Sequence, residues 1–325
     1  MNRVLITGAN GCIGNVLVRF LAGAGYDITA MARDESDTDK IKNIENVKIV
    51  FGDICDTRRM EAILSASIFH IVIHLAGIVH NPNASLEECM EVNYRATSHL
   101  FELSKKYGVK QFIFASTVAV YGEDNEAVLD EDSPVSPQTP YAISKLKAEE
   151  YIRNNHDNII KYTIIRPTTV YGKYDRGNIN KLVNIVKKGV VPIVGNGNNR
   201  KSFVYVENLV EGILKTFFNE KAYNQTFILS DAKPYTMNQF IKTISAALGK
   251  KVIILHLPIR LVLVSLRMLS AGLMLFGKEA TFNASSVKKF TTNNVFDISK
   301  ARKLLNYEPR YSLFYGLQKA FVEHK

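Results

Sequence analysis

The first fourteen residues, MNRVLITGANGCIG, constrain the fold of this chain more than any other stretch. Residues 4–6 form a short apolar run with β-branched members, which predicts a buried strand. Gly8, Gly11 and Gly14 follow at intervals of three, and apolar residues then recur at helical spacing over residues 13–21. The chain therefore begins with a strand, a glycine turn and a helix.

Glycines at such a turn have a defined use in proteins that bind dinucleotides. One permits the tight bend, one lets the backbone approach a pyrophosphate, and one lets the helix pack closely on the strand. The helix N-terminus offers free N–H groups and a partial positive charge to the phosphates. A purely structural turn would use the same residue, but the flanking strand and helix favour dinucleotide binding. The candidate ligands in this segment are Gly8, Asn10, Gly11, Cys12, Ile13 and Gly14.

Strand and helix patterns keep alternating through the first half of the chain. The expected strands span residues 28–32, 47–51, 70–75, 111–115 and 162–166, and the two long helices span residues 87–107, closed by Gly108, and 141–155. This order predicts an α/β fold of the Rossmann type, a doubly wound parallel sheet with helices on both faces. Ligands of such sheets bind beyond the carboxyl ends of the strands.

The rhythm changes after Pro167. We expect a helix at 178–188, a loop at 195–199, returning strands at 203–206 and 227–229, and mainly helices afterwards, with one strand near 252–255. The predicted division is a dinucleotide-binding domain of residues 1–166 plus 200–230. Residues 167–199 plus 231–325 would form a smaller, mainly helical lobe that binds the substrate across a cleft.

The composition is that of an ordinary globular protein, with 46% hydrophobic and 22% charged residues. The net charge of +10 is compatible with a phosphate-bearing substrate. No run of five basic residues occurs, so the cations are expected to be scattered over solvated faces. No interleaved basic and aromatic motif indicates a nucleic-acid partner.

The cysteines and histidines do not predict a metal site. Cys12, Cys55 and Cys89 have no CxxC spacing and are expected to be buried in a reducing compartment. His70 and His74 flank an expected strand, where packing in the core is the simpler role. Because the N-terminus enters a strand at once, we expect no signal peptide and a cytoplasmic location.

One stretch, residues 257–276, complicates that location because it is apolar and long enough to span a bilayer. Arg260 and Arg267 argue against spanning, since each would cost about 2.5–3.5 kcal/mol near a membrane centre. These arginines and Lys278 fall on one helical face. The favoured interpretation is a helix that is buried or faces a dimer partner, and the alternative is peripheral contact with a membrane.

A catalytic set is expected at the end of the fifth strand. Ser116 and Thr117 follow that strand, and Tyr141 and Lys145 lie one turn apart on one face of the next helix. A tyrosine that acts as a base must lose its proton, although its ordinary pKa is about 10. A nearby ammonium and the positive ring of an oxidised nicotinamide would lower that pKa, while Thr117 would hold the substrate oxygen.

With these motifs in place, the chain resembles the extended short-chain dehydrogenase/reductase family, in its NAD-dependent epimerase/dehydratase branch. The resemblance runs nearly the full length and is carried by residues 7–14, 52–54, 74–77, 92–93, 116–117, 141–145, 166–172 and 202–206. It implies that Tyr141 is the acid/base, that Lys145 modulates it and holds the nicotinamide ribose, and that Thr117 completes the set.

The same resemblance implies further contacts to the cofactor and a partner. Asp53 and Ile54 would lie at the adenine, residues 75–77 along the cofactor, and Asn93 near the site as support. The resulting candidates are Asp53, Ile54, Leu75, Ala76, Gly77, Asn93 and Pro167. Members of the family usually form homodimers through the two long helices, here 87–107 and 141–155.

The end of the second strand bears on the choice of cofactor. NAD enzymes usually carry an acidic residue there for the ribose 2′-hydroxyl, whereas this chain has Ala32 and Arg33, with Asp34 one place later. A small residue followed by a cation leaves room and charge for a 2′-phosphate, so among NAD(P) cofactors NADP(H) is favoured over NAD(H). Stacking of Arg33 on the adenine is the alternative.

Residues that depart from the family pattern reduce the number of candidate reactions. Sugar-nucleotide dehydratases place an Asp-Glu pair after the catalytic threonine, but Val118 and Ala119 stand here and cannot exchange protons. Reduction of a UDP-4-keto-6-deoxy-N-acetylhexosamine for a surface polysaccharide is therefore the first prediction, because residues 198–209 and 295–302 look most like such reductases. A UDP-sugar 4-epimerase is the alternative, and a non-catalytic dinucleotide sensor is the third. The candidate substrate contacts are Ser116, Thr117, Thr169, Asn178, Arg200 and Lys201.

Overall fold

A computed structural model of the chain describes residues 2–33, 38–79, 81, 83–122, 126–175, 177–265, 268 and 291–322. Seven parallel strands form the central sheet in the order β12-β7-β5-β4-β1-β2-β3. Their bounds are β1 Arg3–Thr7, β2 Asp27–Ala32, β3 Val47–Phe51, β4 Ile71–His74, β5 Gln111–Ala115, β7 Lys161–Pro167 and β12 Gln225–Leu229. The predicted Rossmann-type α/β fold is confirmed.

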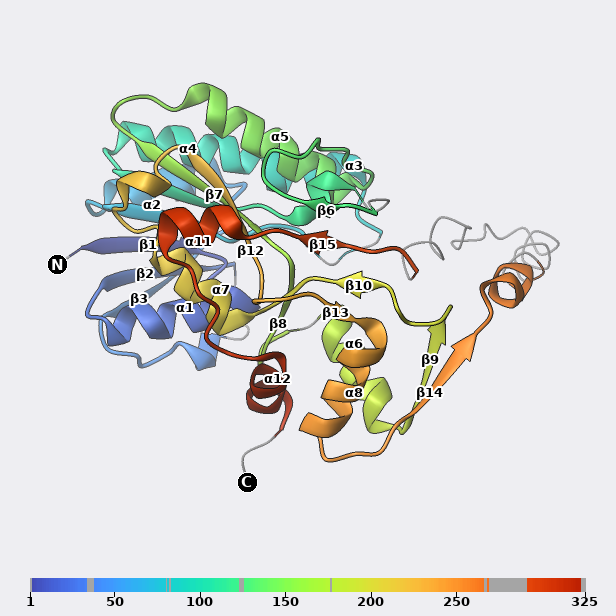
Figure 1. The fold of residues 1–325 in the computed structure, drawn as a ribbon. Helices are drawn as coiled ribbons and strands as arrows, with labels where there is room; N and C mark the ends of the chain where they lie inside the picture. The colour runs from blue at the N-terminus through green and yellow to red at the C-terminus, as the bar shows by residue number, and fades with distance from the viewer. Residues whose placement is uncertain are drawn as a thin grey trace.

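Helices cover both faces of this sheet, with α4 and α5 on one face and α1 and α7 on the other (Figure 1). The alternation of side chains along each strand explains the two layers: Val4 and Ile6 pack toward α1, whereas Leu5 packs toward α2 and α4. The bounds of the helices are α1 Cys12–Gly23, α2 Thr57–Ser65, α3 Leu86–Cys89, α4 Ala96–Lys106, α5 Pro140–Asn155, α6 Asn178–Lys187, α7 Val206–Leu214, α8 Met237–Ala247, α11 Ser299–Leu305 and α12 Leu313–Phe321.

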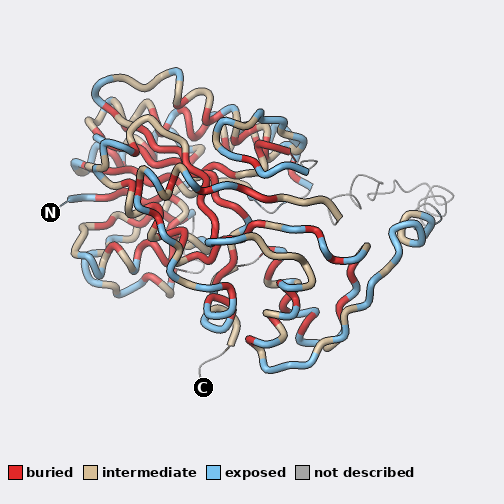
Figure 2. The backbone as a smooth tube through the Cα atoms, viewed as in Figure 1, coloured by how far each residue is buried: buried red, intermediate tan, exposed pale blue. Residues whose placement is uncertain are grey.

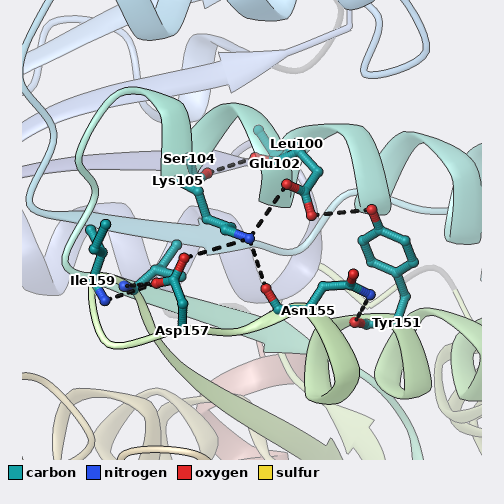
Figure 3. A network of polar contacts seen from close by, with 9 residues as sticks. Leu100, Glu102, Ser104, Lys105, Tyr151, Asn155, Asp157 and Ile159 are labelled. Atoms are coloured by element: carbon teal, nitrogen blue, oxygen red, sulfur yellow. Dashed lines mark hydrogen bonds and ion pairs between the residues drawn. The ribbon is translucent and has the colours of Figure 1, made fainter.

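The helix predicted over residues 87–107 runs without a break over residues 86–106, but its middle turn is π-helical. A π-helical turn, Met90–Arg95, separates α3 from α4, and apolar periodicity cannot reveal such an insertion because the spacing resumes on both sides of it. Figure 3 shows how α4 lies against α5: Lys105 Nζ donates to the Asn155 carbonyl oxygen over 2.9 Å, and the Tyr151 hydroxyl donates to Glu102 over 3.1 Å. Homodimerisation through these two helices stays a prediction.

The second half of the chain adds four small two-stranded sheets. They pair β8 Thr169–Tyr171 with β11 Phe203–Tyr205, β9 Val190–Val194 with β14 Ile253–Leu257, β10 Arg200–Lys201 with β13 Tyr235–Thr236, and β6 Val128–Leu129 with β15 Val295–Phe296. The two strands expected at residues 203–206 and 227–229 correspond to β11 and β12. β12 joins the central sheet beside β7, whereas β11 pairs with β8.

The apolar stretch 257–276 differs from its prediction. Its start is the end of strand β14, residues 259–265 are helical, and the described side chains are mostly exposed rather than buried (Figure 2). A helix buried within the chain is therefore wrong for residues 257–265, whereas a helix that faces a dimer partner stays a prediction. Arg267 and Lys278 lie outside the described residues. No helix in the described part of the chain has the length and apolarity needed to cross a bilayer.

The cysteines are less buried than we predicted. Among the described residues, no group of three His, Cys, Asp or Glu side chains is arranged to hold a metal ion. All three cysteines are free thiols, but only Cys89 is buried, while Cys12 and Cys55 are partly exposed.

Candidate active site

The glycine turn between β1 and α1 forms a cradle for a ligand, with no room for a side chain at Gly8 or Gly14. Gly8 has a φ of +69°, and a Cβ built on it would lie 2.8 Å from the Ala76 nitrogen. A Cβ on Gly14 would strike the Gly8 carbonyl oxygen, so the first turn of α1 rests directly on the backbone of the loop. Gly11 is the N-cap without a side-chain hydrogen bond, and α1 has no acidic residue in its first turn. These features fit a pyrophosphate at the N-terminus of α1.

The other predicted cofactor contacts follow the carboxyl ends of strands in the same sheet. Leu75, Ala76 and Gly77 come directly after β4, and Pro167 ends β7. Ile54 is buried, whereas Arg33 and Asp53 are exposed after β2 and β3. Asn10, Cys12 and Ile13 form the turn and the start of α1; the Asn10 carbonyl oxygen accepts a hydrogen bond from the Asn15 side chain over 2.8 Å. Asp34 lies outside the described residues.

Thr117 lies beside Tyr141, where its hydroxyl lowers the pKa of the phenol. Thr117 follows β5, where its hydroxyl oxygen also accepts from the Ala119 nitrogen over 3.1 Å. Tyr141 lies in the first turn of α5, which Pro140 begins and the Thr139 side chain caps. The end of a strand and the start of a helix thus place two hydroxyls side by side.

Lys145 stands one turn further along α5 and is only 2% exposed. Its ammonium donates to the Ala115 carbonyl oxygen over 2.8 Å and lies 4.6 Å from the centre of the Phe114 ring. A Cβ on Gly77 would be 3.4 Å from the same Nζ, so the ammonium lies beside the loop after β4. Lys145, the predicted catalytic lysine, and the predicted cofactor loop are therefore neighbours.

The acidities of these groups are set mainly by burial. Burial raises the pKa of Tyr141 to about 12, although the hydrogen bond from Thr117 opposes that rise. Burial lowers the pKa of Lys145 to about 8, opposed by the charge of Glu149. The expected lowering of the Tyr141 pKa by Lys145 is not found, and the ammonium donates to Ala115. In this state Tyr141 holds its proton.

Asn93, in the π-helical turn, ties the loop after β4 to α5. Its side-chain oxygen accepts from the Ile78 nitrogen over 2.8 Å, and its nitrogen donates to the Ser144 hydroxyl over 3.0 Å. The Ser144 hydroxyl then donates to the Tyr141 carbonyl oxygen over 2.9 Å. Asn93 is fully buried, so these bonds fix the cofactor loop relative to the helix that carries Tyr141 and Lys145.

His74 extends the same network and has a definite proton position. The Thr97 hydroxyl donates to the Asn93 carbonyl oxygen over 2.8 Å, so it accepts from His74 Nε2 over 2.9 Å. His74 Nδ1 then accepts from the Thr7 hydroxyl over 2.7 Å. His74 is fully buried, and burial lowers its pKa to about 3, with the Lys145 charge as the second cause.

The neutrality of His74 predicts a loss of stability in acid. Between about pH 6.5 and 3 the unfolded chain binds a proton that the folded chain refuses, so the free energy of unfolding falls by about 1.4 kcal/mol for each pH unit below 6.5. Urea unfolding at pH 7.5 and 5.5 measures this fall. His74→Asn should lower stability at pH 7.5 but show a smaller fall, whereas the exposed control His256→Asn should keep it. An unchanged fall in His74→Asn would contradict this assignment.

A buried ion pair between Arg166 and Glu149 contacts Ser116, the residue before Thr117. Arg166 donates to both oxygens of Glu149, over 3.0 and 2.6 Å, and to the Tyr121 hydroxyl over 2.6 Å. The Ser116 hydroxyl donates to the same carboxylate. The Ser116 hydroxyl is therefore committed to the ion pair, while the substrate contacts expected of Ser116 and Thr117 stay predictions.

The remaining predicted substrate contacts lie in the second half of the chain. Thr169 is exposed at the start of β8, and Arg200 and Lys201 form β10. Asn178 is exposed as the first residue of α6, and Gly177 is the N-cap, so Asn178 does not cap this helix.

Sequence reasoning missed His74, Thr97, Glu149 and Arg166 as supports of the site. Glu149 was detectable, because it lies four residues after Lys145 on the same face of α5. His74 gave only the signal of a polar residue at the end of a buried strand.

Known proteins resemble this chain in sequence and in fold. Residues 4–227 match the NAD dependent epimerase/dehydratase family. An N-acetyl-α-D-glucosaminyl-diphospho-ditrans,octacis-undecaprenol 4-epimerase of Escherichia coli O157:H7 is 31% identical over 98% of this chain and 94% of its own length. A UDP-glucose 4-epimerase of Vibrio cholerae is 28% identical over 97% of this chain and 93% of its own. The crystal structure of a UDP-glucose 4-epimerase of Thermotoga maritima with UDP-glucose superposes with a TM-score of 0.78 at 26% identity, covering 98% of this chain and 97% of the other.

Proposed function

The chain belongs to the NAD-dependent epimerase/dehydratase family, and from its site we propose that it is a 4-epimerase of a sugar diphosphate. One observation carries the proposal: Thr117, Tyr141 and Lys145 lie together beside the cofactor loop, while Val118 and Ala119 supply no group for dehydration. The relatives with 4-epimerase names favour this reaction over the reduction that we first expected. Epimerisation therefore replaces reduction as the leading candidate.

The residues of the chain have distinct tasks in this reaction. A bound oxidised nicotinamide would supply a reversible acceptor for the C4 hydride and a positive charge that favours the Tyr141 phenolate. Tyr141 takes the proton from O4 in the first half and gives it back in the second. Thr117 orients O4 through its hydroxyl, and the ammonium of Lys145 holds the ribose beside Gly77.

The sugar ring must turn over between the two hydride transfers. The protein must therefore hold the substrate by its diphosphate and not by the ring. We assign this role to Arg200 and Lys201, whose charges suit a diphosphate. Thr169 and Asn178, which belong to the proposed substrate-binding lobe, are the further candidates. Residues 167–199 plus 231–325 remain our proposed substrate-binding lobe.

An assay for net cofactor use tests this proposal. The protein is incubated with UDP-N-acetylglucosamine, UDP-glucose and polyprenyl-diphospho-N-acetylglucosamine, and the C4 epimers are resolved by chromatography. We expect one of these to be interconverted with no net use of NAD(P)H. Absence of every epimer, together with stoichiometric oxidation of NADPH by a UDP-4-keto-6-deoxy-N-acetylhexosamine, would return the assignment to reduction.

The choice between NAD and NADP depends on Arg33. The relatives solved with a cofactor are described as NAD complexes, yet the exposed Arg33 after β2 favours a 2′-phosphate. We expect NADPH to bind more tightly than NADH, and Arg33→Ala to weaken NADPH binding about tenfold, as for loss of a charge-assisted hydrogen bond. Arg19→Ala, on α1, is the matched control. Titration of nicotinamide fluorescence gives both constants, and equal affinities in the unmodified protein would refute the preference.

A further inference from the structure

The net positive charge of this protein is confined to one part of the chain. Residues 176–206 and 232–278 contain thirteen Lys and Arg and no Asp or Glu, whereas the rest of the chain has 28 Lys and Arg against 31 Asp and Glu. Lys and Arg therefore outnumber Asp and Glu only because of these two segments. The two acid-free segments contribute α6, β9, β10, β13, α8 and β14.

An apolar surface lies on the same part of the molecule. In the parallel pair of β9 and β14, Val190 lies beside Ile253 and Pro192 beside Leu255, and all four side chains are exposed. The alternate residues of β9, among them Val191, are buried against the core that contains α6 and α8. This two-stranded sheet thus has one covered face and one apolar face toward solvent.

The chain then leaves the lobe as a short helix that projects away from the body (Figure 1). We call β14 and the helical residues 259–265, with Met268, the apolar arm. Its exposed apolar side chains include Leu261 at 63%, Val264 at 46% and Met268 at 71%. Of seventeen exposed large hydrophobic side chains in the described part of the protein, seven lie on the arm or on β9. Such a concentration marks an interaction surface.

Exposed cations flank this apolar surface. Lys187 and Lys188 end α6, and Lys250 and Lys251 precede β14; the Ile253 nitrogen donates to the Gly189 carbonyl oxygen over 2.8 Å, which brings the two pairs together. Arg260 is exposed on the arm itself.

We propose that the apolar arm docks on the surface of a bilayer that contains anionic lipids. Its apolar side chains would enter the boundary between headgroups and acyl chains, while the flanking cations contact lipid phosphates. Charge decides against a second copy of this chain, because the acid-free segments of two copies, with thirteen Lys and Arg in each chain, would repel one another. The proposal stands independently of the reaction that the site performs.

Flotation with lipid vesicles tests this docking. We expect the protein to float with vesicles of phosphatidylcholine and phosphatidylglycerol, and much less with phosphatidylcholine alone or at high salt. Leu261→Asp with Val264→Asp should reduce the bound fraction at least about tenfold, because charge replaces the inserted apolar groups. Lys250→Glu with Lys251→Glu should remove the preference for the anionic lipid. The control Ile68→Asp, at a side chain 71% exposed after α2, should float like the unmodified protein.

Two further measurements make the outcome decisive. Thermal unfolding and epimerase activity on a water-soluble sugar nucleotide should be unchanged in the arm variants, which separates loss of docking from misfolding and from failure of the proposed reaction. Light scattering in the absence of lipid reports self-association through the arm. No flotation of the unmodified protein, equal flotation of the arm variants, or an oligomer that only the arm variants lose would overturn the proposal.

Discussion

Replacing Tyr141 with phenylalanine should lower kcat by about 10³-fold, within the usual range for loss of a general acid or base. The variant keeps the aromatic ring but loses the hydroxyl that meets Thr117 and exchanges the proton at O4. Cofactor affinity should change little, because the glycine cradle and Lys145 remain in place. Steady-state kinetics and cofactor titration measure both quantities.

Tyr26→Phe is the matched control for this change. Tyr26 precedes β2, at the amino ends of the strands, whereas the site lies at their carboxyl ends. The variant should therefore keep full turnover. If Tyr141→Phe turned over at the rate of the control, the acid/base role would belong to another group.

Replacing Arg166 with methionine should lower the free energy of unfolding by about 3–5 kcal/mol, as expected when one partner of a buried ion pair is removed. Glu149 is completely buried and Arg166 is 3% exposed. The variant leaves that carboxylate with Arg153, which reaches only one of its oxygens over 2.6 Å, and with the Ser116 hydroxyl. Urea unfolding at neutral pH measures the loss.

An exposed ion pair provides the comparison for Arg166. Arg3 bonds Asp27 over 2.8 Å with both side chains more than 40% exposed, so Arg3→Met should cost at most about 1 kcal/mol. Similar losses in the two variants would show that burial does not set the strength of the internal pair.

The central sheet was predictable because its inner strands β1, β4, β5 and β7 are buried on both faces. Each reads as a short apolar run, and the intervening helices repeat at 3.6 residues, so residues 28–32, 47–51 and 111–115 were placed to within a residue. The pairings β10 with β13 and β6 with β15 involve two residues per strand, which is too few for a periodic signal. The arm was misjudged because an apolar run does not tell whether the protein covers it.

The arrangement of the candidate site was predictable where sequence spacing determines which residues share a face. The separation of Tyr141 and Lys145 by four residues defines one helical face, and the glycines define the cradle. The support of the site was not predictable, because the bonds from His74 to Thr7 and Thr97 join segments that only the fold brings together. The pKa of Tyr141 likewise depends on burial, which spacing does not encode.

The most direct test of this account uses a sugar diphosphate that carries deuterium at C4. If the enzyme removes a hydride from C4 and returns it within one binding event, NMR of the product formed in ordinary water will show the opposite configuration at C4 with the deuterium retained. An epimer that has lost its deuterium to solvent or to free cofactor would contradict the account.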